Sequence, residues 1–252
     1  MLTRPQGQTA EAQHALETAG ARVLLFPALE IVPEPESDAL RNGAARATEA
    51  HRLIFASPNA VRYGVPWIRQ AGGPAPGTLF AAVGEATAAA LEREGLAPVV
   101  RPANGATSED LLAEPEFVQI RGERVMIVRG VGGRGYLADT LRRRGASVEF
   151  LEVYRRRRPA ADPAPLLTEI RKGGVAAAVV TSAEALKNFV ALIGPEGREW
   201  LAAAALIVVS ERIAVQARPL ASRVEVAETP SADHLVAAVA RALAIPQQEQ
   251  NR

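Results

Sequence analysis

The chain repeats part of its own sequence at an offset of about 125 residues, and this repeat restricts the possible folds more than any other feature. Five pairs of segments match in the same order along the chain, although each match is weak by itself. Clear examples are Gly20-Ala-Arg-Val23 with Gly145-Ala-Ser-Val148, and Ser57-Pro-Asn-Ala-Val61 with Ser182-Ala-Glu-Ala-Leu186. An ordered series at nearly one spacing predicts two copies of one structural unit.

Each copy alternates short apolar runs, typical of buried strands, with helical patterns, of which residues 86–94, 183–192 and 213–220 are the clearest. Polar turns such as Ser57-Pro-Asn59 and Thr107-Ser108 supply N-cap candidates for these helices. This alternation predicts an α/β fold with two similar lobes, each a parallel sheet flanked by helices. We expect the ligand at the carboxyl ends of the strands, between the lobes.

The repeat allows either two lobes in tandem or one lobe nested within the other. Leu29-Glu-Ile-Val-Pro33 and Glu152-Val-Tyr-Arg-Arg156 occupy equivalent repeat positions and both look extended. Two such crossing segments can pair as a two-stranded antiparallel hinge, which favours nesting. We therefore expect lobe 1 at residues 1–33 and 158–252, lobe 2 at 37–152, and linkers at 28–36 and 152–158.

A glycine-rich loop follows the apolar strand pattern that begins at Arg124. Gly130-Val-Gly132-Gly-Arg-Gly135 has the G-x-G-x-x-G form of a dinucleotide site, and Glu152 lies about 20 residues further on, where a ribose-binding acid would stand. Glycines let backbone N–H groups approach an anion at a helix N-terminus, but that anion could equally be a carboxylate. The repeat partner of this loop, Arg4-Pro-Gln-Gly-Gln-Thr9, lacks the glycine pattern, which disfavours a dinucleotide.

Positive charge is concentrated in one part of a nearly neutral chain. Residues 121–158 contain eleven arginines and four acidic residues, whereas the whole chain has a net charge of +1. A local cationic surface of this kind favours a discrete anionic ligand over a nucleic acid. The alternative is that Arg142-Arg-Arg144 and Arg155 to Arg158 are merely solvated arginines on a helix and a linker.

Composition excludes several other classes of protein. The chain has no cysteine, so it has neither disulfides nor a thiol nucleophile, which fits a cytoplasmic protein. We find no signal-peptide pattern, and the longest apolar run, Leu201 to Val209, is far shorter than the roughly 20 residues of a membrane helix. His14, His51 and His234 lack metal-ligand spacing, so surface positions and no metal site are expected.

A series of short motifs runs along the chain in a fixed order: Leu2-Thr-Arg-Pro5, Phe55-Ala-Ser57-Pro-Asn-Ala-Val61, Val83-Gly84-Glu-Ala-Thr87, Arg129-Gly-Val-Gly-Gly-Arg134, Glu152-Val-Tyr154-Arg155, Val179-Val-Thr-Ser182-Ala-Glu184 and Val208-Val-Ser210-Glu-Arg212. This ordered series resembles that of bacterial uroporphyrinogen-III synthases. No single motif is specific, but the ordered series spans essentially the whole chain.

The resemblance implies an enzyme of haem biosynthesis with two α/β lobes joined by a two-stranded antiparallel ladder. It implies that the enzyme closes hydroxymethylbilane, a linear tetrapyrrole with eight carboxylates, and inverts ring D. The products would be uroporphyrinogen III and water, with no cofactor. Closure without the enzyme gives the uninverted isomer, so the main task of the protein would be to hold ring D in the right orientation.

The resemblance also assigns residues. Tyr154 matches the hinge tyrosine of the family, and a phenol that stays protonated at neutral pH can donate to the leaving hydroxyl; the alternative is that Tyr154 only packs at the hinge. The matched substrate-binding residues, many of which would act through backbone N–H groups, are Arg4, Ser57, Asn59, Thr87, Ser108, Arg129, Gly130, Ser182 and Ser210. Ser57 and Ser182 could in addition cap helices.

The chain departs from the family pattern in two places. Only Met1 and Leu2 precede Thr3, where the family usually has a longer first strand, and Ile213 stands where many members have a threonine. The polar tail Pro246 to Arg252 is expected to be disordered.

The main rival is a non-catalytic, two-lobed binding or sensor protein for an anionic small molecule, which would have a similar sequence. We expect no binding of nucleic acid, because aromatic residues are few, and no membrane association, because the apolar runs are short. We expect a monomer, because no apolar helix is evidently exposed.

Overall fold

The computed structural model describes residues 1–133 and 135–244 and divides the chain into two compact units. One unit comprises Met1–Glu30 with Arg157–Arg252, and the other comprises Ile31–Arg156. We call them the outer unit and the inner unit, after their order in the sequence. The tail that the sequence predicts to be disordered, Pro246 to Arg252, lies outside the described residues.

The inner unit contains most of a six-stranded sheet with the strand order β1-β6-β5-β2-β3-β4. The pairs β6–β5, β5–β2, β2–β3 and β3–β4 are all parallel, as expected for strands joined by helices. The strands are β1 (Glu30–Pro33), β2 (Arg52–Phe55), β3 (Leu79–Ala82), β4 (Val99–Val100), β5 (Arg124–Gly130) and β6 (Ser147–Arg157). The connecting helices are α2 (Asp38–Thr48), α3 (Pro58–Gln70), α4 (Glu85–Arg93), α5 (Ser108–Ala113), the short 3₁₀ helix η1 (Pro115–Phe117) and α6 (Tyr136–Arg143).

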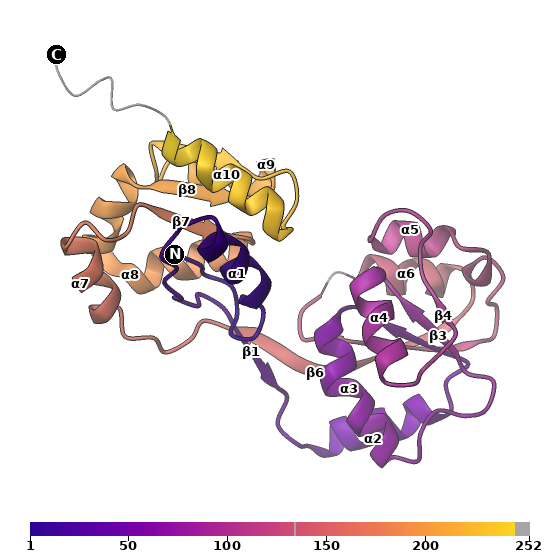
Figure 1. The fold of residues 1–252 in the computed structure, drawn as a ribbon. Helices are drawn as coiled ribbons and strands as arrows, with labels where there is room; N and C mark the ends of the chain where they lie inside the picture. The colour runs from indigo at the N-terminus through magenta and orange to yellow at the C-terminus, as the bar shows by residue number, and fades with distance from the viewer. Residues whose placement is uncertain (134, 245–252) are drawn as a thin grey trace. The chain divides into compact units, whose positions relative to one another are not determined.

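Alternation along the strands distributes the core of the inner unit over two faces of the sheet. Leu53 and Phe55 of β2 pack with α2, α3 and α4, whereas Ile54 packs with α5, η1 and α6. Helices therefore cover both faces of the sheet (Figure 1), and residues 53–55 of β2 and 125–128 of β5 are buried apolar residues between them.

β1 is hydrogen-bonded along β6, so the two extended segments expected from the sequence do pair. The backbone N–H of Glu34 donates to the carbonyl of Val153, and Arg157 Nε lies 2.8 Å from the carboxylate of Glu30. The residue numbers of the two segments run in opposite directions, because Glu30 meets Arg157 and Glu34 meets Val153. This is the order of an antiparallel pair. β6 is one continuous strand of eleven residues, longer than the expected linker 152–158, and its part from Ser147 to Tyr154 pairs in parallel with β5.

The outer unit contains a smaller parallel sheet with the order β7-β8-β9. Its strands are β7 (Ala177–Val180), β8 (Ala205–Val208) and β9 (Arg223–Val226), and its helices are α1 (Ala10–Thr18), α7 (Ala164–Arg171), α8 (Ala183–Ala203), α9 (Glu211–Ala217) and α10 (Ala232–Ala244). α7, α8 and α9 pack on one face, and α1 and α10 on the other. The sequence thus predicted the fold class correctly for both sheets.

The first residues of the chain extend this smaller sheet. Leu2 forms parallel bridges with Leu25 and with Val179 of β7, and both Leu2 and Thr3 are completely buried. The short start found in the sequence therefore still supplies strand pairing. Among the described residues, no helix is long and apolar enough to cross a membrane.

Candidate functional site

A cavity of about 320 Å³ opens in the inner unit where the parallel strands end. Five residues proposed from the sequence line it together: Ser57, Ser108, Arg129, Gly130 and Tyr154. They come from segments that follow β2 and β4, from the end of β5, and from the position on β6 where its pairing with β5 ends. Because parallel strands bring their carboxyl ends to one edge, residues up to 97 positions apart meet there.

Tyr154 and Ser57 are joined directly at this cavity. The phenol oxygen lies 3.0 Å from Ser57 Oγ, and Tyr154 is only 5 % exposed. Ser57 is also the N-cap of α3, because its Oγ accepts from the backbone N–H of Ala60 at 3.1 Å. The predicted cap is thus confirmed, and the same oxygen holds the tyrosine.

Gly130 is required by the ring of Tyr154. A Cβ at position 130 would lie 2.6 Å from two carbons of that ring. The register shifts between Arg129 and Gly130, so that Gly130 pairs with Tyr154, and the N–H of Val131 donates to the carbonyl of Tyr154 at 2.8 Å. This β-bulge sets the direction in which the tyrosine points. The first glycine of the G-x-G-x-x-G pattern therefore makes room for a side chain of the same protein.

Glu152 is bound by Arg129. Arg129 Nε and Nη2 donate to the same carboxylate oxygen of Glu152 at 3.2 and 3.0 Å. The guanidinium carbon lies 3.9 Å from the centre of the Phe150 ring. The acid that a dinucleotide fold would use for the ribose is thus an internal partner of an arginine.

Ser108 follows Thr107, which forms a capping box with Asp110 at the start of α5. Thr107 Oγ1 accepts from the N–H of Asp110 at 3.1 Å, and the N–H of Thr107 donates back to the carboxylate of Asp110 at 3.0 Å. The Thr107 hydroxyl also donates to this carboxylate, and these bonds lower the pKa of Asp110. Thr107 rather than Ser108 caps the helix, so Ser108 is left at its first position.

Asn59 and Thr87 do not belong to the residues that line this cavity. Asn59 stands in the first turn of α3 and is half-buried. Thr87 is 4 % exposed, and its N–H donates to the carbonyl of Gly84 at 3.0 Å, in the first turn of α4. Both follow the carboxyl ends of strands, although neither lines the cavity that contains Tyr154.

Arg4, Ser182 and Ser210 lie in the outer unit, at the corresponding edge of its sheet. Ser182 follows β7 and caps α8 by accepting from the N–H of Ala185 at 3.0 Å, as predicted, and Ser210 stands at the N-cap position of α9 after β8. Arg4 Nη2 donates to the carbonyl of Pro230 at 2.5 Å, and burial lowers the pKa of Arg4.

Most arginines of the basic segment have structural partners. Arg144 Nη1 donates to two backbone carbonyls, those of Leu112 and Phe117, at 2.7 and 2.8 Å. Arg142 donates to the carbonyl of Val148, and Arg155 and Arg157 form ion pairs with glutamates of the β1 segment. These arginines therefore have structural roles that the sequence did not show, and among the described arginines of the segment Arg129 and Arg156 line the cavity.

Sequence reasoning missed several residues that complete the cavity, among them Val83, Ala106, Thr107, Leu137, Phe150 and Arg156. Arg156 could have been found from strand alternation, because it follows Tyr154 by two positions on β6. Phe150 could not, because the bulge between Glu152 and Tyr154 interrupts the alternation. Leu137 and Ala106 carry no such signal, because only the folded sheet brings their segments to this edge.

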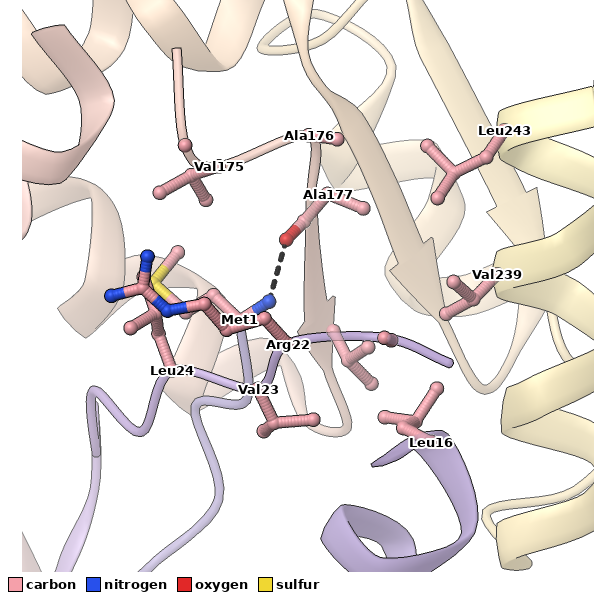
Figure 2. Close-up of a pocket in the computed structure, with 13 residues that line it drawn as sticks. Met1, Leu16, Arg22, Val23, Leu24, Val175, Ala176, Ala177, Val239 and Leu243 are labelled. Carbon is pink, nitrogen blue, oxygen red and sulfur yellow. Dashed lines mark hydrogen bonds between the residues drawn. The ribbon is translucent and has the colours of Figure 1, made fainter. Parts of the chain in front are cut away.

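A second cavity of about 230 Å³ lies in the outer unit, at the amino end of β7 (Figure 2). Its wall is mainly apolar and includes Val23, Val175 and Leu243. The amino group of Met1 donates to the carbonyl of Ala177 at 2.8 Å, and burial lowers the pKa of this amine from 8.0 to about 6. None of the residues proposed from the sequence lines this cavity.

Neither His14 nor His51 is buried, as expected, whereas His234 is half-buried beside Thr229. In the described part of the chain, no group of three or more His, Asp or Glu side chains is arranged to hold a metal ion.

Comparison with known proteins gives one consistent result. The profile of the family described as uroporphyrinogen-III synthase HemD matches residues 10–237. Uroporphyrinogen-III synthase of Escherichia coli (strain K12) is 34 % identical over 242 residues, which cover 95 % of this chain and 98 % of that protein. The enzyme of Salmonella typhimurium has the same identity and coverage.

Solved structures agree in fold. A mutant uroporphyrinogen III synthase from the extremely thermophilic bacterium Thermus thermophilus superposes with a TM-score of 0.60 at 22 % identity, covering 96 % of this chain and 97 % of that one. Uroporphyrinogen-III synthetase from Helicobacter pylori 26695 gives a TM-score of 0.57 at 16 % identity, covering 89 % and 96 %. At these identities the likeness concerns the fold alone.

Proposed function

Because this chain belongs to the uroporphyrinogen-III synthase family, we propose that it cyclises hydroxymethylbilane to uroporphyrinogen III with inversion of ring D and release of water. It is a cyclising lyase of haem biosynthesis. The observation that carries this conclusion is the family match over residues 10–237, together with 34 % identity to the Escherichia coli enzyme across nearly the whole of both chains.

Tyr154 is the proposed acid, supported by its position. Its hydroxyl lies at the cavity edge beside Ser57 Oγ, which already accepts one hydrogen bond from the backbone of α3. When Ser57 donates its proton to the phenol oxygen, the phenol proton is left to point into the cavity. Tyr154 then protonates the leaving hydroxyl, which departs as water, and the bond from Ser57 stabilises the phenolate that remains.

The remaining steps need little from side chains. Loss of water leaves an electrophilic azafulvene, and the substituted carbon of ring D attacks it to give a spiro intermediate. That intermediate fragments and closes again through the other α-carbon of ring D, so the ring is inverted. The proton released as the ring becomes aromatic restores Tyr154. The protein therefore acts mainly by holding the rings in the productive orientation, and the proposed reaction uses no cofactor.

Carboxylate binding is assigned to the rest of the cavity edge. Arg129 and Arg156 supply positive charge, and the N-terminus of α3 presents backbone N–H groups beside Ser57. Gly130 and Ser108 complete this set in the inner unit. Asn59 and Thr87, and in the outer unit Arg4, Ser182 and Ser210, stay proposals that rest on the family resemblance.

We further propose that the two compact units correspond to the lobes expected at residues 1–33 with 158–252 and at 37–152. We also propose that the protein works as a monomer and that it is cytoplasmic. The lack of cysteine fits a reducing compartment.

Turnover distinguishes the enzyme from a binding or sensor protein. A large excess of hydroxymethylbilane is mixed with a small amount of protein, and uroporphyrinogen III is followed after oxidation to the porphyrin. We expect many equivalents of isomer III per protein. A binding protein would give isomer III in no more than one equivalent, and that result would reject the proposal.

A further inference from the structure

Glu152 occupies a position on β6 that the proposed mechanism does not use. It stands two residues before Tyr154 and is 36 % exposed, whereas the Arg129 side chain that it binds is only 12 % exposed. Both Nε and Nη2 of Arg129 donate to one carboxylate oxygen. A guanidinium with so little exposure needs such a partner, because an uncompensated charge there would be costly.

The guanidinium group of Arg129 has the Phe150 ring on one side and the glycine loop on the other. The Phe150 ring centre lies 3.9 Å from its guanidinium carbon. Around Gly133, the position that a Cβ would take is 3.4 Å from Arg129 Nη1 and 3.5 Å from its guanidinium carbon, so the group lies along the backbone of the glycine loop. Arg129 therefore connects β6 to the loop that begins at Gly130.

This arrangement places the Arg129–Glu152 ion pair at the wall of the cavity that the glycine loop and Phe150 form. Arg129, Gly130, Gly133 and Phe150 all line the same cavity as Tyr154. Removing the carboxylate of Glu152 would allow Arg129 to rotate away from Phe150, and the backbone of the glycine loop would lose its support. The groups that we assign to carboxylate binding would then lose their fixed geometry.

We infer that Glu152 is a positioning residue for substrate binding, which acts through Arg129 to hold the glycine loop and the arginine in place for the carboxylates of the tetrapyrrole. This inference rests on the proposed synthase function. The inferred role favours substrate binding, whereas the negative charge of Glu152 alone should weaken it, because a carboxylate near the site repels a substrate with eight carboxylates.

The sign of the change in KM therefore tests the inference. Steady-state kinetics with hydroxymethylbilane are compared for the wild type and Glu152→Gln. Positioning predicts that KM rises by about tenfold, the size expected for lost charge-assisted hydrogen bonds, whereas kcat changes less than about twofold. A purely electrostatic role predicts a lower KM. A lower or unchanged KM would overturn the inference.

A matched control lies on the same strand. Glu149 accepts from Arg46 Nε at 2.6 Å and is not among the residues that line the cavity, so Glu149→Gln makes the same charge change and breaks a similar ion pair. We expect its KM to be unchanged or lower. If Glu149→Gln raises KM as much as Glu152→Gln, the effect is not specific to Arg129, and the inference is wrong.

A double-mutant cycle tests whether Glu152 acts through Arg129. In an Arg129→Gln background, Glu152→Gln should raise KM no further, and a second, independent increase would contradict the inference. Thermal unfolding is followed for each variant; if Glu152→Gln does not fold, Glu152→Asp replaces it, with the same expected rise in KM. If the wild type forms no isomer III, the proposed function fails, whereas a wild-type KM in a folded, active Glu152→Gln variant rejects only the role of Glu152.

Discussion

The phenol oxygen of Tyr154 lies 3.0 Å from the hydroxyl oxygen of Ser57, and this contact joins β6 to the N-cap of α3. The two residues are 97 positions apart and meet because β6, β5 and β2 are neighbouring parallel strands. One hydroxyl thus caps a helix and orients the proposed acid. Stability and catalysis are therefore coupled at Ser57 and can be separated at Tyr154.

Tyr154→Phe should remove the acid and keep the fold. Because general acid catalysis contributes about 10²–10⁴-fold, we expect kcat for isomer III to fall by at least about 100-fold. The buried ring stays in place, so the free energy of unfolding should fall by only about 1 kcal/mol for the lost hydrogen bond. Stopped assays of isomer III and urea unfolding measure the two effects. Wild-type turnover in this variant would exclude Tyr154 as the acid.

Ser57→Ala should reduce both stability and activity. Loss of the cap costs about 1 kcal/mol, and the loss of the bond to Tyr154 should lower kcat by about five- to tenfold. Ser37→Ala is the matched control, because Ser37 caps α2 by accepting from the N–H of Leu40 at 3.2 Å. The control should lose similar stability and keep its kcat; an equal loss of kcat in both variants would attribute the effect to stability alone.

Gly130→Ala should displace the tyrosine ring. The added methyl would stand 2.6 Å from the Tyr154 ring, closer than packed atoms allow, so the ring or the strand must move. We expect a loss of about 1–3 kcal/mol of stability, typical of an overpacked core, together with a kcat at least as low as that of Tyr154→Phe. A crystal structure of the variant would show the displaced ring. Full activity would mean that the bulge does not fix the position of Tyr154.

The buried amine of Met1 should make stability depend on pH. Its pKa is about 6 in the folded protein and 8.0 when unperturbed, so between these values the unfolded chain binds the proton more strongly. Stability should therefore rise as the pH is raised from 6 to 8, by at most about 2.7 kcal/mol. Urea unfolding of a chain with a free amine at Met1 measures this rise.

Acetylation of that amine is the control for the other groups that titrate in this range, above all the three histidines. The difference in stability between the free and the acetylated chain should shrink as the pH rises from 6 to 8. A difference that is constant with pH would show that Met1 does not titrate as described.

Much of this fold could be predicted because its determinants are local or repeated. The repeat between the segments at Ser57 and Ser182 indicated two α/β units, and both serines do cap helices after parallel strands. The extended pattern around Leu29 and Tyr154 likewise predicted a pairing that β1 and β6 make. Periodicity and capping act over a few residues, so the sequence displays them directly.

The interactions of the site could not be predicted in the same way. The glycine pattern at Gly130 suggested an anion cradle, but the glycine is required by the ring of Tyr154, 24 positions away. The arginines of the basic segment suggested an anionic ligand, but the sequence did not show that Arg144 donates to backbone carbonyls or that Arg129 pairs with Glu152. The register of the sheet and the bulge at Gly130 determine which of these side chains meet, and neither can be predicted from a single sequence.

The isomer formed from hydroxymethylbilane tests the central claim most directly. Uncatalysed closure gives isomer I, so the ratio of isomers measures whether the protein inverts ring D. With the wild-type protein in catalytic amount, the account predicts isomer III as the main product, formed faster than spontaneous closure. Isomer I alone, formed at the rate measured without protein, would contradict it.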